Sequence, residues 1–218
     1  MKTSRRQEKC LMIKFIFLKI FGWKIKGENN FTKKCIIIVA PHTHWLDFFL
    51  GITIRKVINT HAYFVAKKEL FFFPLNIFLK YFGAIPVERN SNSNSVELLA
   101  EKFRNKKIFR LGLSPEGTRK KVKKWKTGFY YIAIKASVPI ISVSLNVIKR
   151  EINISEPFYP TNDIKKDFSN LKKFFKGTVG IVKEYSRKIL CIMMDFLNII
   201  VFFTFLDKTF KFFSLLIV

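Results

Sequence analysis

The sequence predicts a single α/β domain with a mainly parallel central sheet flanked by helices. Short apolar runs rich in β-branched residues alternate with helix-like segments, and this alternation is typical of a parallel sheet. The chain has 218 residues, which is enough for one domain with short appendages. Polar residues follow the ends of several apolar runs, where α/β folds place their chemistry.

The first half of the chain contains the clearest strand signal. The run Cys35-Ile-Ile-Ile-Val-Ala40 is apolar and β-branched, which favours a buried strand. Gly83 and Pro86 bracket a short apolar run, so a turn is expected to lead into a brief strand that ends at Arg89. The expected elements are a helix at 10–21, a strand and turn at 22–32, a strand at 35–40, a helix from about 47 into the fifties, and a strand at 63–66.

The second half continues the alternation and shows no internal repeat. The Ser/Asn-rich stretch 90–95 favours a loop. The expected elements after it are a helix at 96–105, a strand at 108–113, a helix at 129–136, a strand at 139–147, a turn at 158–160 and an amphipathic helix at 164–175.

The composition combines a net charge of +25 with a mean hydropathy of +0.14. An anionic membrane surface satisfies both properties, because apolar groups enter the interface while lysines meet the head groups. Nucleic-acid binding is disfavoured for two reasons. The positive charge occurs together with long Phe and Ile runs, and the sequence shows no recognisable DNA- or RNA-binding motif. AT-rich codon usage is a further source of the Lys, Ile, Asn and Phe excess.

The three cysteines are scattered along the chain, at Cys10, Cys35 and Cys191. Their spacing fits neither a metal site nor a disulfide framework. We therefore expect a reducing, cytoplasmic compartment and no metal ion.

Four segments are candidates for membrane contact. Residues 10–21 are too short to span a bilayer and predict either an interfacial helix or a helix packed on the core. The apolar stretch 71–82 is expected to line a site for the acyl chain, to contact the membrane, or to pack in the hydrophobic core. The basic run 120–126 is a solvated loop or attracts an anionic lipid or acidic carrier protein. The hydrophobic tail 186–218 spans the membrane, touches it or is a non-functional extension.

His42 and Asp47 stand directly after the buried strand, with four residues between them. A carboxylate at this spacing can hold one ring nitrogen of the histidine and fix its tautomer, which leaves the other nitrogen to accept a proton from a hydroxyl. The substrate's own hydroxyl could then act as the nucleophile. A structural histidine is the alternative, and His44 is a second candidate without this spacing.

Two further motifs carry groups suited to phosphate. Arg89 has the planar fork that binds phosphate in a bidentate way, although a surface salt bridge explains it equally well. The stretch Glu116-Gly117-Thr118-Arg119 combines a tight turn with exposed N–H groups, a hydroxyl and a fixed positive charge. Glu116 could receive a substrate hydroxyl or orient Arg119.

Taken in this order, the motifs resemble those of the glycerolipid acyltransferase family, and in particular of bacterial 1-acylglycerol-3-phosphate acyltransferases. The matching residues are His42 and Asp47, Arg89 after Gly-Ala-Ile-Pro-Val, Glu116 to Arg119, and the Val138-Pro-Ile140 strand. The resemblance covers roughly residues 22–185. His44, Trp45-Leu46 and Ser142 depart from the usual family pattern, but none of them removes a group that the chemistry needs.

The resemblance implies an O-acyltransferase that moves a fatty acyl group from acyl-carrier protein or acyl-CoA to a lysophospholipid, giving phosphatidic acid. His42 and Asp47 would be catalytic, and Arg89, Glu116, Gly117, Thr118 and Arg119 would bind the acceptor and its phosphate. No cofactor or metal is implied. The expected location is the cytoplasmic face of the cell membrane. A non-catalytic membrane-binding relative, or an enzyme for another lysolipid, is the alternative.

These expectations divide the chain into three regions. Residues 1–27 form a basic membrane-contact segment, residues 28–185 form the acyltransferase domain, and residues 186–218 form the hydrophobic tail.

Overall fold

The computed structural model describes residues 11–27, 30–44, 46–88, 92–118 and 122–180, and it confirms the α/β class. One sheet of seven strands has the order β1-β7-β6-β2-β5-β3-β4. The neighbours from β6 to β4 all pair in parallel, whereas β7 pairs with β6 in the antiparallel sense. The strands are β1 (Lys24–Lys26), β2 (Lys34–Ala40), β3 (Tyr63–Lys67), β4 (Ala84–Val87), β5 (Phe109–Leu113), β6 (Ile140–Asn146) and β7 (Glu151–Ile154).

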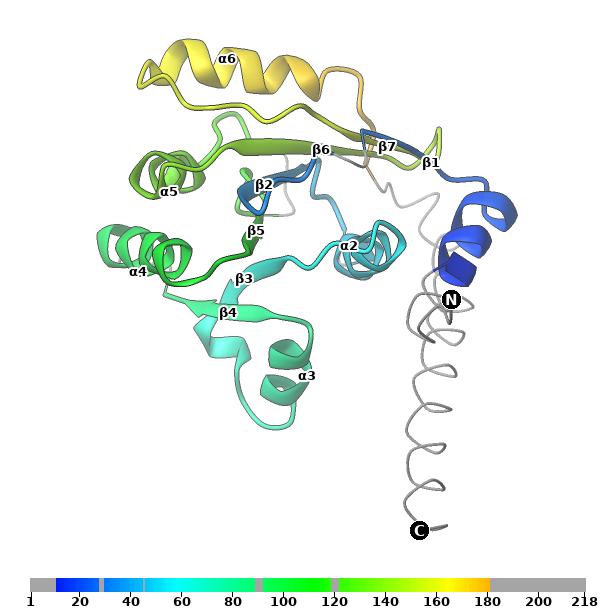
Figure 1. The fold of residues 1–218 in the computed structure, drawn as a ribbon, viewed down its shortest axis with the longest axis horizontal. Helices are drawn as coiled ribbons and strands as arrows, with labels where there is room; N and C mark the ends of the chain where they lie inside the picture. Colours follow the sequence, from blue (N-terminus) through cyan, green and yellow to red (C-terminus); the bar gives the residue numbers. More distant parts are fainter. Residues whose placement is uncertain (1–10, 28–29, 45, 89–91, 119–121, 181–218) are drawn as a thin grey trace.

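Helices cover both faces of the sheet (Figure 1). They are α2 (Leu46–Val57), α3 (Leu75–Tyr81), α4 (Asn92–Asn105), α5 (Gly128–Ala136) and α6 (Ile164–Phe174). A short 3₁₀ helix, η2 (Lys68–Leu70), precedes α3, and the N-terminal helix covers residues 11–20 and ends in the π-helix η1 (Ile16–Ile20). The alternating side chains of β2 separate two cores. Cys35 and Ile37 join a cluster with α2 and the N-terminal helix, while Ile36 and Ile38 join a cluster with α4, α5 and α6.

The N-terminal helix packs on the domain by one face and leaves apolar groups on the other. Ile13 and Phe17 are buried, and the Phe17 ring stacks on Trp23 with 5.3 Å between centroids. Leu11 and Phe15 are exposed. Core packing therefore accounts for the inner face, and membrane contact by the outer face stays a prediction.

The structure corrects the expected loop at 90–95 and adds one strand that was not expected. Helix α4 begins at Asn92, inside the stretch expected to be a loop. The Ser95 hydroxyl donates to the backbone oxygen of Glu88 at 3.1 Å, which holds the first turn of the helix. Strand β7 was not predicted, because its alternation of polar residues with Ile152 and Ile154 is only four residues long and follows a charged turn.

Within the described residues, every helix falls short of the length and apolar character that crossing a bilayer requires. The described residues do not include residues 1–10 or the tail 186–218. They also do not include residues 28–29 and 181–185, where the expected boundaries of the acyltransferase domain fall.

Candidate active site

The parallel register brings the motif after β2 and the motif after β5 to the same edge of the sheet. Ile38 of β2 lies opposite Leu113 of β5, and Ala40 lies opposite Ser144 of β6. His42 and Glu116 therefore follow neighbouring strand ends, although 74 positions separate them in the sequence.

Asp47 holds the ring of His42. The His42 Nδ1 atom lies 3.0 Å from Asp47 Oδ2. Asp47 stands in the first turn of α2, where the helix dipole favours a carboxylate, and its side chain is 5% exposed. The same oxygen accepts the backbone N–H groups of Thr43 and His44, each at 2.8 Å. Several donors therefore converge on one carboxylate, which holds the backbone of Thr43 and His44 beside the His42 ring.

This geometry leaves one ring nitrogen of His42 for chemistry. With Nδ1–H donated to Asp47, the Nε2 lone pair is the basic site. No hydrogen bond joins Nε2 to any of the described residues, and the His42 side chain is 28% exposed. The position can therefore accept a proton from a substrate hydroxyl. The ring that contacts Asp47 is that of His42, whereas His44 donates its backbone N–H to the same carboxylate.

Glu116 is hydrogen-bonded to the backbone of His42, a contact that the sequence did not indicate. Its Oε2 accepts the backbone N–H of His42 at 2.9 Å. Burial raises the pKa of the Glu116 carboxyl above its usual range, and the nearby charge of Asp47 acts in the same direction, while the His42 N–H partly opposes them. Glu116 therefore positions the backbone that carries His42.

Replacing this carboxyl with an amide should make stability less dependent on pH. A raised pKa means that the folded state loses stability as pH rises through the folded pKa. The change Glu116→Gln keeps an oxygen for the His42 N–H but removes this loss. The free energy of unfolding of both proteins is measured with urea at one pH below and one pH above the range in which carboxyl groups titrate. The variant should gain stability relative to the parent at the higher pH only, and an equal pH dependence in the two proteins would refute the assignment.

Gly117 forms a turn that brings Lys126 beside the site. Its φ of +64° is a left-handed conformation that favours glycine. A Cβ atom there would lie 2.8 Å from Cδ of Lys126, so the lysine stem crosses the glycine closely. The Lys126 N–H donates to the Pro115 oxygen at 2.8 Å, which fixes the two segments together.

A side chain at Gly117 should cost stability through both strain and contact. We expect Gly117→Ala to lower the free energy of unfolding by about 1–2 kcal/mol from the left-handed backbone alone. The control is Gly51→Ala in α2, where an added Cβ meets nothing within 4 Å. That change should stabilise the protein by roughly 0.5–1 kcal/mol. Urea unfolding of both variants checks the opposite signs, and equal effects would contradict this description of the turn.

The remaining predicted residues are placed only in part. Thr118 follows Gly117 in the same turn and is half-buried. Arg89 and Arg119 lie outside the described residues. Strand β4, which precedes Arg89, ends at Val87, opposite the end of β3 at Lys67. Among the described residues no three His, Cys, Asp or Glu side chains gather in a way that could hold a metal ion.

Two supporting contacts were missed by the sequence analysis. Gly180 packs against the segment around His42, where a Cβ would lie 2.7 Å from Thr43 Oγ1 and 2.9 Å from Pro41 Cγ. No local pattern marks this glycine, because its neighbours in space are distant in sequence. Lys126 was grouped with the basic run, and its place against Gly117 follows only from the turn geometry.

Two curated proteins with the same name are similar to this chain. The 1-acyl-sn-glycerol-3-phosphate acyltransferase of Saccharomyces cerevisiae is 27% identical over 144 residues, which are 62% of this chain and 46% of the yeast protein. The Escherichia coli protein of the same name is 29% identical over 145 residues, or 62% of this chain and 58% of its own length. The chain thus spans about half the length of the curated relatives it matches.

A solved structure and a family model complete the comparison. The fold is shared with the crystal structure of the 1-acyl-sn-glycerophosphate (LPA) acyltransferase PlsC from Thermotoga maritima, with a TM-score of 0.54, 22% identity and 81% of each chain covered. The Acyltransferase family model matches residues 22–146, which include His42, Asp47 and the Glu116 turn. Since that match covers more than half of the sequence, the chain belongs to the acyltransferase family.

Proposed function

We propose that this protein is an O-acyltransferase that moves a fatty acyl group from a thioester to the free hydroxyl of 1-acylglycerol-3-phosphate, giving phosphatidic acid. The observation that carries the proposal is the His42–Asp47 pair, 3.0 Å apart, with Nε2 of His42 left as a base. The names of the yeast and bacterial relatives support this acceptor.

The reaction needs a base, and no nucleophile from the protein. His42 Nε2 accepts the hydroxyl proton as the acceptor oxygen attacks the thioester carbonyl carbon. The C–O bond forms and the C–S bond breaks. The proton then passes from His42 to the departing thiolate. Asp47 stabilises the positive imidazole between the two transfers, and Glu116 holds the backbone beneath it.

The acceptor phosphate would be held by arginine, lysine and backbone groups around the Glu116 turn. Arg89, Arg119, Gly117 and Thr118 keep the roles that their motifs predict. We add Lys126, because its stem lies against Gly117 and no carboxylate of the described residues pairs with it. The acyl donor is acyl-carrier protein or acyl-CoA, and neither a metal ion nor an organic cofactor is needed.

The net charge of +25 supports a location on an anionic membrane surface, which we place at the cytoplasmic face. Such a surface holds the lysophospholipid acceptor and the diacyl product. The soluble thioester donor would reach the enzyme from the aqueous side.

A direct assay tests the proposed reaction. The purified chain is incubated with acyl-CoA or acyl-carrier protein and with 1-acylglycerol-3-phosphate in mixed micelles, and products are identified by mass spectrometry. We expect phosphatidic acid and free thiol in equal amounts. If neither donor gives phosphatidic acid while other lysolipids are acylated, the proposed acceptor is refuted. The proposed reaction type, acyl transfer to a hydroxyl, would still stand.

Lys126 should affect acceptor binding more than turnover. The change Lys126→Met keeps the stem over Gly117 and removes the charge, so we expect the KM for the phosphate acceptor to rise by about three- to tenfold with kcat little changed. Lys123→Met is the matched control in the same basic run and should leave KM unchanged. An equal effect of both variants would show that only the overall charge matters.

A further inference from the structure

Six large apolar side chains between η2 and the end of α3 are exposed to solvent. They form the α3 patch, which consists of Leu70, Phe72, Phe73, Ile77, Phe78 and Tyr81. Phe73 is 78% exposed, and Phe72 and Ile77 are 58% and 62% exposed. Soluble proteins rarely leave so many large apolar groups together on one surface, and such a patch marks an interaction site.

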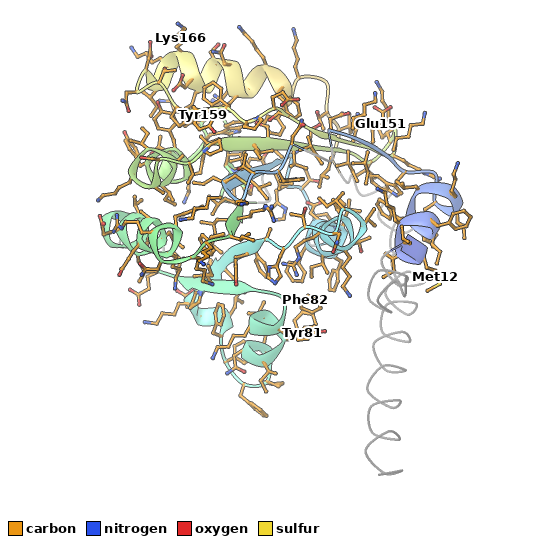
Figure 2. The ribbon with its side chains drawn as sticks, viewed as in Figure 1. Met12, Tyr81, Phe82, Glu151, Tyr159 and Lys166 are labelled. Carbon is orange, nitrogen blue, oxygen red and sulfur yellow. The ribbon has the colours of Figure 1, made fainter. Side chains whose placement is uncertain are left out.

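The α3 patch lies on the part of the molecule that extends furthest past the β4 edge of the sheet. Figure 1 shows α3 below β4, away from α5 and α6, which lie at the opposite side of the molecule. Figure 2 shows Tyr81 on α3 and Tyr159 on the far side, near α6. The patch is therefore free to meet a flat surface without interference from α5 and α6.

Aromatic contacts join the patch to the catalytic motif. Phe48 follows Asp47 in α2, and its ring centroid lies 6.5 Å from that of Phe78 and 6.3 Å from that of Phe82. The Arg55 guanidinium, also in α2, donates to the Phe82 oxygen at 2.8 Å. Helix α3 is thus fixed to the helix that begins beside the His42–Asp47 pair.

The border of the patch is positively charged. Lys67, Lys68 and Lys80 are exposed, Glu69 stands among them, and Lys68 forms an ion pair with Glu88. The three lysines outnumber the two glutamates, so the border keeps a small positive charge. Exposed aromatic side chains with lysines around them suit a bilayer interface, where rings enter the acyl region and ammonium groups meet anionic head groups.

We propose that the α3 patch inserts into the interface of an anionic lipid bilayer and that lipid acceptors reach His42 past Phe48 from that side. This inference rests on the proposed function for the identity of the lipid acceptor. The insertion itself depends only on the exposed side chains and their charged border. A protein partner would be expected to leave vesicle binding unaffected by changes in the patch.

Vesicle binding by the full-length chain tests the insertion without any need for turnover. The variant Phe72→Ser/Phe73→Ser/Ile77→Ser is compared with Ile108→Ser/Tyr131→Ser/Tyr159→Ser, which alters exposed apolar residues elsewhere. With phosphatidylcholine vesicles containing phosphatidylglycerol, we expect the first variant to lose roughly tenfold or more in partition. The control should bind as the parent does, and both should keep the parent's circular dichroism.

Fluorescence locates the patch directly, even if other segments also hold the protein on the membrane. The variants Phe73→Trp and Tyr159→Trp each add a tryptophan to the three native ones. We expect brominated acyl chains to quench the added signal at position 73 and not at position 159. An unquenched signal at 73 on vesicle-bound protein overturns the proposal, as does a fall in self-association of the serine variant without any loss of vesicle binding. An enzymatically inactive protein that still shows quenching at position 73 would refute the proposed function alone.

Discussion

Loss of the His42 ring should lower kcat/KM for acyl transfer by about 10²–10⁴-fold. The ring supplies the base, and the structure offers Nε2 as its free nitrogen. We expect His42→Ala to keep its fold and its thermal unfolding midpoint, because the side chain is partly exposed and Asp47 keeps the backbone N–H groups of Thr43 and His44 as donors. Initial rates of thiol release with 1-acylglycerol-3-phosphate measure the effect.

His44→Ala is the matched control for the base. This change leaves the backbone N–H that donates to Asp47 in place. Its rate should stay close to that of the parent. If His44→Ala loses as much activity as His42→Ala, or if His42→Ala stays within a few-fold of the parent, the base has been assigned to the wrong residue.

Asp47→Ala should reduce both activity and stability. The rate should fall by about 10²–10⁴-fold, because His42 loses the group that orients its ring and stabilises its charge. The N–H groups of Thr43 and His44 also lose their acceptor, and unmade hydrogen bonds of partly buried groups cost about 1–3 kcal/mol. Urea unfolding should therefore separate this variant from His42→Ala, which keeps the carboxylate.

The double variant tests whether the two residues act as one unit. If Asp47 acts through His42, the variant with both changes should be no slower than His42→Ala. Rate losses that multiply would show that Asp47 contributes to catalysis independently of the ring.

Most strands and most helices could be predicted because local patterns carry them, whereas β7 was missed because it is only four residues long. The run from Cys35 to Ala40 is apolar enough to be recognised alone, and β2 is buried on both faces as expected. The start of α4 could not be predicted, because the Ser/Asn residues that favour loops also occur in first helical turns and Ser95 is held by Glu88, seven positions earlier.

The site shows a similar division between local and long-range information. The spacing of His42 and Asp47 predicts their contact, because the loop and the first turn of α2 are continuous. The hydrogen bond from His42 N–H to Glu116 could not be predicted from spacing, since it depends on the register of β2 and β5. The exposure of α3 was likewise undetermined, because an apolar run reads alike whether it is buried or faces outward.

The central claim is that the acceptor hydroxyl attacks the thioester directly, with no acyl group carried by the protein. Cys35 is buried, and burial raises the pKa of its thiol to about 11, which makes it a poor nucleophile. Rapid-quench intact-mass spectrometry of the protein with acyl thioester alone, followed by addition of 1-acylglycerol-3-phosphate, tests the claim most directly. We predict no acylated protein and no thiol burst until the acceptor is added. A stoichiometric acyl-protein that forms without acceptor and is discharged by it would contradict the mechanism.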